Sequence, residues 1–144
     1  MCYNIGMSKS FFMPSSVQLD AIRRKHGLAL LLLHGSLVRG KLHSNSDVDI
    51  AYLREHPERD LSAVTLLADL SEAFQTDQID CVDLTHADPL LLYAVVVHSR
   101  LLSGDEEAYQ TLERRAFHRY HDYQPYLTLE RRMVRDTLQS YVTA

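Results

Sequence analysis

The sequence predicts a mixed α/β fold, in which helices cover a small mixed β-sheet and further helices follow at the C-terminal end. Two observations lead to this fold class. Up to Gly104, short apolar runs with strand character alternate with segments whose apolar residues recur at helical spacing. Beyond Gly104, only helical patterns remain. Strands and helices in this order are typical of a sheet with a helical cover.

The length and composition are those of a globular domain. The chain has 144 residues, of which 46% are apolar and 24% are charged. We expect a single domain over residues 1–144, with a core of about 15–103 and a helical extension of about 104–144. The formal net charge of −4 provides no general attraction to nucleic acid or to anionic membrane. No apolar stretch is long enough to span a bilayer or to serve as a signal peptide, so we expect a cytoplasmic protein.

A helix and a buried strand are expected first. Ser15 or Ser16 can cap a short helix that ends near Gly27. The apolar run over residues 28–33 then indicates a strand buried on both faces.

A polar loop over residues 35–46 follows, with a turn of helix expected at residues 38–42. Residues 47–53 alternate in the manner of a second strand, which has an acidic end. Asp47 and Asp49 are two residues apart in this strand. Both carboxylates therefore leave the same face, with their Cα atoms about 6–7 Å apart.

The middle of the chain predicts two helices around a third strand. Residues 60–75 carry one apolar stripe at helical spacing, and residues 78–84 have strand character. Pro89 starts the next helix at a first-turn position, where its missing N–H costs nothing. The segment 90–97 is apolar on nearly all sides and is expected to be well buried.

Residues 100–102 form either a short edge strand or a turn. Two helices are then expected, separated at Gln124-Pro125. One face of the last helix carries four apolar residues, which are Leu127, Val134, Leu138 and Tyr141.

The most informative segment is Gly35-Ser36, followed by ten residues and then the pair Asp47 and Asp49. Small residues let backbone N–H groups approach phosphate oxygens closely. Paired carboxylates are hard oxygen ligands that can share Mg²⁺, which commonly completes its coordination with substrate phosphates. A P-loop is excluded, because Leu42 stands where that motif needs serine or threonine. The segment therefore predicts binding of a nucleoside triphosphate together with a divalent metal.

This segment resembles the active-site signature of the DNA polymerase β-type nucleotidyltransferases, in particular their minimal branch. The residues that match the signature are Gly35, Ser36, Arg39, Gly40, Ser46, Asp47 and Asp49. The strand 79–84, followed by Pro89, resembles the strand that carries the family's third carboxylate. The resemblance covers roughly residues 15–103 and implies a polymerase β-like nucleotidyltransferase core.

The resemblance implies catalytic roles for carboxylates. In nucleotidyl transfer, an oxygen nucleophile attacks the α-phosphorus in line while pyrophosphate leaves, and two metal ions assist both events. Asp47 and Asp49 would bind two Mg²⁺ ions together with a third carboxylate. Asp80 and Asp83 point to opposite faces of their strand, and periodicity does not choose between them. The family pattern matches Asp80, so we select Asp80 and rank Asp83 second.

The resemblance also implies a nucleotide site, with ATP as the substrate. Gly35 and Ser36 would bind the β- and γ-phosphates, with Arg39 or Ser46 as auxiliaries. His34 departs from the family, in which a bulky aromatic residue often precedes the Gly-Ser pair. We interpret it as a packing residue.

Minimal nucleotidyltransferases of this size resemble the antitoxin half of HEPN/MNT toxin–antitoxin pairs. In those pairs the enzyme transfers AMP from ATP to a tyrosine of a HEPN-type ribonuclease toxin, so we expect such a protein partner. Two alternatives are transfer to a small molecule such as an aminoglycoside, and a non-catalytic antitoxin that acts by binding alone. The cluster of Tyr120, Tyr123 and Tyr126 is either a docking surface for the partner or a seal between the C-terminal helices and the sheet.

Overall fold

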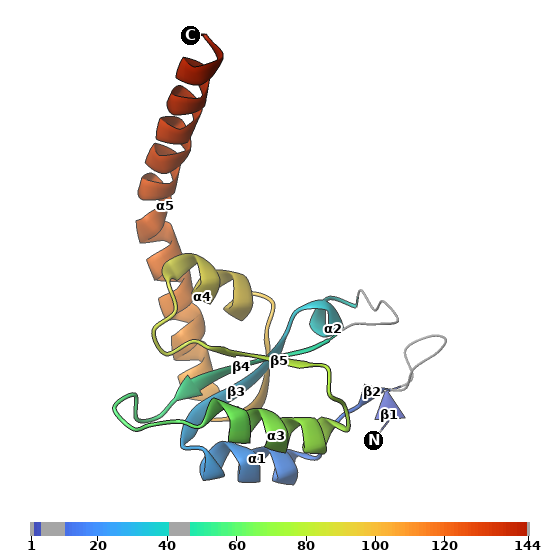
Figure 1. The fold of residues 1–144 in the computed structure, drawn as a ribbon. Helices are drawn as coiled ribbons and strands as arrows, with labels where there is room; N and C mark the ends of the chain where they lie inside the picture. Colours follow the sequence, from blue (N-terminus) through green and yellow to red (C-terminus); the bar gives the residue numbers. More distant parts are fainter. Residues whose placement is uncertain (1, 4–10, 41–46, 144) are drawn as a thin grey trace.

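A mixed four-stranded sheet forms the centre of the molecule in the computed structural model, which describes residues 2–3, 11–40 and 47–143 (Figure 1). The strand order is β5-β4-β3-β6. β3 (Leu28–His34) runs antiparallel to β4 (Val48–Arg54) and to β6 (Arg100–Gly104). β5 (Ile79–Asp83) is parallel to β4. The predicted mixed sheet is confirmed, and the segment after residue 99 is an edge strand.

Two helices cover one face of the sheet (Figure 1). α1 (Ser16–Lys25) begins with a capping box, in which the Ser15 side chain accepts a hydrogen bond from the N–H of Gln18 at 3.2 Å. α3 (Ala63–Phe74) is capped by the side chain of Ser62. The buried side chains between these helices and the sheet include Leu19, Leu31, Leu33, Ile50, Leu66, Leu70 and Phe74.

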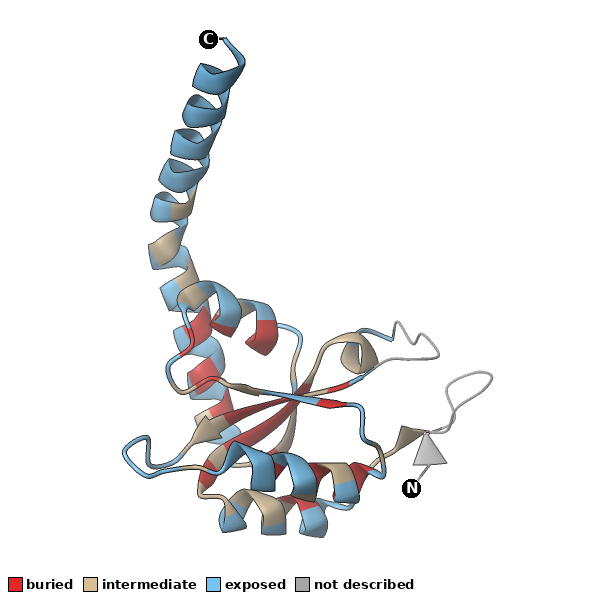
Figure 2. Ribbon diagram, in the orientation of Figure 1, coloured by how far each residue is buried: buried red, intermediate tan, exposed pale blue. Residues whose placement is uncertain are grey.

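The other face is covered by α4 (Pro89–Val96) and by the first part of α5 (Glu106–Val142). Asp88 caps α4, because its Oδ1 accepts hydrogen bonds from two backbone N–H groups at 2.9 Å. The buried side chains on this face include Leu30, Leu32, Ala51, Leu92, Val96, Tyr109 and Leu112. Figure 2 shows that burial is concentrated in the sheet and in the helix faces that contact it.

The prediction of two C-terminal helices separated at Gln124-Pro125 was wrong. α5 is one continuous helix with Pro125 inside it. Pro125 is exposed, so the carbonyl group that loses its helical partner lies where water can hydrogen-bond to it. The helix therefore accommodates Pro125 without breaking at this position.

The prediction that the segment 90–97 is well buried was also wrong in part. Leu90, Leu91 and Val97 are 37%, 40% and 48% exposed. α4 presents only one side to the sheet and to α5, so the remaining apolar side chains face outward. Burial of an apolar helix depends on which neighbours are available to cover it.

Two short elements complete the fold. α2 (Ser36–Arg39) forms the expected turn of helix, starting slightly earlier than the predicted residues 38–42. β1 (Cys2–Tyr3) and β2 (Phe11–Phe12) make a separate antiparallel pair. Within the described residues, none of the helices combines the length and the apolar character required to cross a membrane.

Candidate active site

Asp49 lies between two register partners at one end of the sheet. It pairs with His34 across the β3–β4 ladder and with Asp80 across the β4–β5 ladder. Register partners in neighbouring strands direct their side chains to the same face. Leu32, two residues before His34, belongs to the core beneath α4 and α5. His34, Asp49 and Asp80 therefore form a row on the α4 and α5 side of the sheet.

The register also separates the two candidates for the third carboxylate. Asp83 pairs with Tyr52, whose side chain belongs to the core on the opposite face, beneath α1 and α3. Asp83 Oδ1 accepts a hydrogen bond from the backbone N–H of Thr85 at 2.9 Å, which stabilises the loop after β5. Asp80, in contrast, lies beside Asp49 and is exposed. Of the two residues, only Asp80 has a position suited to a site built around Asp49.

Gly35 brings the chain reversal after β3 into contact with Asp49. Its φ of +79° lies in the left-handed region that favours glycine. A Cβ atom at this position would lie 2.1 Å from Oδ2 of Asp49, so any side chain there would have to displace the Asp49 carboxylate. Ser36, the first residue of α2, follows at once and is half-buried. The Gly-Ser bend and the aspartate strand thus converge in space, as the sequence predicted.

The charges in this row influence one another. Burial raises the pKa of Asp49, the neighbouring His34 opposes this effect, and the negative charges of Asp80 and Asp47 raise the pKa further. The pKa of His34 is lowered, because its burial outweighs the attraction of Asp49 and Arg39 adds to the decrease. Three carboxylates that repel one another in this way gain stability when a cation neutralises them.

The oxygen donors fit a magnesium site that a substrate would complete. Asp47, Asp49 and Asp80 provide the hard ligands that Mg²⁺ prefers. Across residues 2–3, 11–40 and 47–143, no three His, Cys, Asp or Glu side chains are already gathered closely enough to enclose a metal ion. Mg²⁺ rarely uses such an all-protein cage and takes many of its ligands from substrate phosphates and water.

The remaining predicted site residues have different positions. Asp47 is exposed directly before β4, and Arg39 is exposed at the end of α2. Ser46 lies outside the described residues. His34 was interpreted as a packing residue, but its register places it beside Asp49. Its position immediately before Gly35 was the sequence signal that could have revealed this proximity.

A carboxylate row beside a glycine bend, on a mixed sheet with helical cover, is the arrangement of a nucleotidyltransferase. Residues 18–108 match the family described as Polymerase beta, Nucleotidyltransferase. This stretch is more than half of the chain, and the chain belongs to that family. The resemblance and the fold class predicted from the sequence are confirmed.

Individual relatives give a narrower comparison. The chain is 35% identical over 80 residues to Protein adenylyltransferase MntA of Shewanella oneidensis strain MR-1, which covers 56% of this chain and 57% of the relative. The chain thus aligns with little more than half the length of this curated relative. A chain in the crystal structure of a toxin–antitoxin with AMP-PNP matches with a TM-score of 0.65 and 27% identity, covering 87% of this chain and 98% of the other. A chain in the toxin–antitoxin complex MntA-HepT matches with a TM-score of 0.57 and 26% identity, covering 86% and 96%.

Proposed function

We propose that this chain is an adenylyltransferase antitoxin, which transfers AMP from ATP to a tyrosine of a HEPN-type ribonuclease toxin and so neutralises it. The observation that carries the proposal is the pairing of Asp49 with Asp80 beside the Gly35 bend, in a chain of the nucleotidyltransferase family. The similarity to Protein adenylyltransferase MntA and to toxin–antitoxin complexes supports a protein acceptor.

In the proposed site, Asp47, Asp49 and Asp80 would hold two Mg²⁺ ions, which would neutralise the triphosphate and lower the pKa of the acceptor hydroxyl. The backbone at Gly35 and Ser36 binds the β- and γ-phosphates, because the bend has no side chain that would keep them away. Arg39 and Ser46 are proposed auxiliaries in nucleotide binding.

The transfer step makes a bond between the acceptor oxygen and the α-phosphorus, and it breaks the bond from that phosphorus to pyrophosphate. The acceptor proton passes to a carboxylate or to solvent. Asp80 is exposed on the edge strand β5, so a hydroxyl group on a separate protein can reach it. We propose that its carboxylate accepts this proton.

The setting of the reaction follows from its reactants. ATP and the RNA that a ribonuclease toxin would attack are both cytoplasmic, so we propose that the chain acts in the cytoplasm. The net charge of −4 provides no general attraction to a nucleic acid acceptor.

Label transfer tests this function. The chain is incubated with ATP labelled at the α-phosphate, Mg²⁺ and the HEPN-type protein encoded beside it. We expect label on a tyrosine of that protein, loss of the toxin's ribonuclease activity, and no reaction when EDTA removes the metal. The double variant Asp47→Asn, Asp49→Asn is expected to transfer nothing, while Asp83→Asn serves as the matched control. Absence of label with the wild-type chain, or full neutralisation of the toxin by the double variant, would contradict the proposal.

A further inference from the structure

α5 extends far beyond the part of it that packs on the domain. The helix has 37 residues, but its buried residues are Tyr109, Leu112 and Ala116, all in its first third. Figure 1 shows the rest of the helix projecting away from the sheet. The packing of α5 against α4 reaches Tyr120, whose ring stacks on Tyr93 with centroids 3.9 Å apart. Tyr120 therefore packs against α4, and this contact is with a helix and not with the sheet to which a seal was predicted.

The apolar side of α5 continues past this point. Leu127, Val134, Leu138 and Tyr141, here named the distal stripe, follow the buried residues on the same side of the helix. Val134, Leu138 and Tyr141 are 59%, 60% and 78% exposed. Leu127 is half-buried, whereas residues 128–143 are all exposed, as Figure 2 shows for the end of the helix. A stripe of this kind is stable in water chiefly when another surface covers it.

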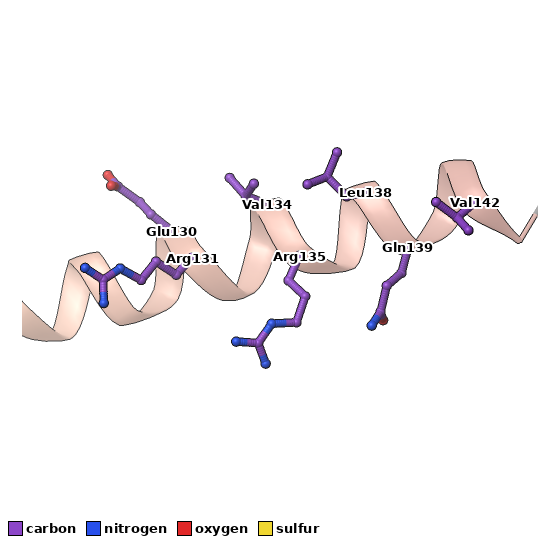
Figure 3. A pocket seen from close by; sticks show the side chains of 7 residues that line it. All are labelled: Glu130, Arg131, Val134, Arg135, Leu138, Gln139 and Val142. Atoms are coloured by element: carbon purple, nitrogen blue, oxygen red, sulfur yellow. The ribbon is translucent and has the colours of Figure 1, made fainter.

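The charges beside the distal stripe differ between its two sides. In Figure 3, Glu130 projects from the same edge of the helix as Val134 and Leu138, whereas Arg131 and Arg135 lie along the other edge. All residues that line this surface come from α5, so it is an open helix face and not an enclosed cavity. A partner that covers the stripe would therefore meet a basic border on one side.

This border indicates which kind of partner fits. Two copies of α5 could also pair with each other, antiparallel about a twofold axis. In that arrangement the basic border of one stripe would lie against the basic border of the other. Arg131 and Arg135 would then face their own copies, which is unfavourable because like charges repel. A helix with an apolar stripe and acidic residues along one border avoids this repulsion and forms ion pairs instead.

We propose that the distal stripe binds an amphipathic helix of the toxin, with acidic toxin residues beside Arg131 and Arg135. This inference rests on the proposed function, which names the toxin as the partner. α5 follows β6 directly and covers the same sheet face as the row of His34, Asp49 and Asp80. A toxin held on α5 is thus kept close to the site, which raises the local concentration of its acceptor tyrosine.

A pair of charge substitutions tests the surface. In the full chain, Val134→Glu with Leu138→Glu is expected to weaken binding of the HEPN-type protein about tenfold or more in calorimetric titration. The matched control is Leu129→Glu with Met133→Glu, which lie on the other side of α5 and are 48% and 59% exposed. This control is expected to bind within about twofold of the wild-type affinity.

The charged border is tested separately, with substitutions that preserve helix propensity. Arg131→Glu with Arg135→Glu is expected to weaken binding, with a loss that shrinks as salt concentration rises. Arg132→Glu, on the other side of the helix, is the control. Circular dichroism of each variant checks that α5 stays helical. The inference would be overturned if the stripe variant and the Arg131, Arg135 variant both bound the toxin with wild-type affinity. It would also be overturned if these variants lost no more affinity than their controls.

Two further measurements separate this inference from the proposed function. At toxin concentrations far above the dissociation constant, the stripe variant is expected to transfer AMP at the wild-type rate. The Asp47→Asn, Asp49→Asn variant is expected to bind the toxin normally and to transfer none. A wild-type chain that binds through the stripe but transfers no AMP supports the surface and contradicts the function. Self-association of the chain alone that Val134→Glu abolishes, seen by sedimentation, would overturn the inference in favour of a second copy.

Discussion

Asp49 of β4 and Asp80 of β5 occupy the same row of the parallel ladder between these strands. They come from different strands that are separated in the chain by the whole of α3. Because both strands run in the same direction, their first residues meet at the same end of the sheet. The bend at Gly35 reaches that end from the neighbouring strand β3. Three segments of the chain therefore contribute to one small region.

Substitutions on β5 test the assignment of the third carboxylate. Asp80→Asn is expected to lower the rate of AMP transfer about 100-fold or more, because it removes a negative oxygen ligand beside Asp49. Asp83→Asn is expected to retain activity, because Asp83 bonds to the loop after β5. Initial rates with labelled ATP measure both. Equal losses of transfer rate in the two variants would mean that the strand register does not determine which aspartate is the third metal ligand. The thermal unfolding temperature of Asp80→Asn is expected to be no lower than that of the wild type, since the substitution relieves repulsion.

Two glycines with similar backbone angles give a matched pair. Gly35 and Gly40 have φ values of +79° and +69°. Alanine at either position costs about 1–2 kcal/mol in the left-handed region. At Gly35 the new Cβ would also lie 2.1 Å from Asp49 Oδ2, whereas at Gly40 no atom of the described residues lies within 4 Å. Gly35→Ala is thus expected to displace the Asp49 carboxylate and to abolish transfer, while Gly40→Ala lowers stability and keeps activity. Unfolding in urea and label transfer measure the two effects, and an active Gly35→Ala variant would refute the close approach.

The contact between α1 and α3 predicts a pH dependence of stability. Asp69 Oδ2 accepts hydrogen bonds from Lys25 Nζ at 2.8 Å and is 2.7 Å from His26 Nε2. The hydrogen bond from Lys25, and then that from His26, lower the pKa of Asp69. A carboxyl group whose pKa is lower in the folded state stabilises the fold above its unfolded pKa of about 4. This contribution is lost as the pH falls through the folded pKa.

Asp69→Asn is therefore expected to reduce the free energy of unfolding at neutral pH, by less than about 1 kcal/mol because the pair is close to solvent. In acid, where Asp69 is protonated in the wild type, the two proteins are expected to converge. Urea unfolding over a pH series measures this, with Glu72→Gln at an exposed site of α3 as the control. A difference that persists unchanged in acid would show that the lost interaction is not ionic.

Removal of the proline from α5 is expected to act locally. Pro125→Ala restores a backbone N–H to the helix and removes a residue that costs about 3 kcal/mol relative to alanine in a helix interior. Amide hydrogen exchange of residues 126–142 is expected to slow. The global unfolding temperature is expected to change little, because the buried residues of α5 end at Ala116. Gln124→Ala is the control, and equal protection in both variants would count against a local effect of proline.

The local elements were accessible from the sequence, because the signals that specify them lie within a few residues. Ser15 as a cap, the apolar run of β3 and the proline that starts α4 all occur where they were predicted. The Gly-Ser bend and the following Asp-x-Asp strand were likewise predictable, since spacing along the chain identifies them. Pro125 shows the limit of such signals, because a helix break depends on whether water can satisfy the freed carbonyl group.

By itself, then, the sequence determined the class of fold, the order of its elements and the segment that carries the glycine bend and two of the carboxylates. The choice of Asp80 over Asp83 as the neighbour of Asp49, the position of His34 beside Asp49 and the exposure of the distal stripe were decided by the tertiary structure. These features depend on strand register and on which surfaces find a covering neighbour. Both are set when segments far apart in the chain pack together, so a local pattern, such as the place of His34 before Gly35, can point to these features but does not fix them.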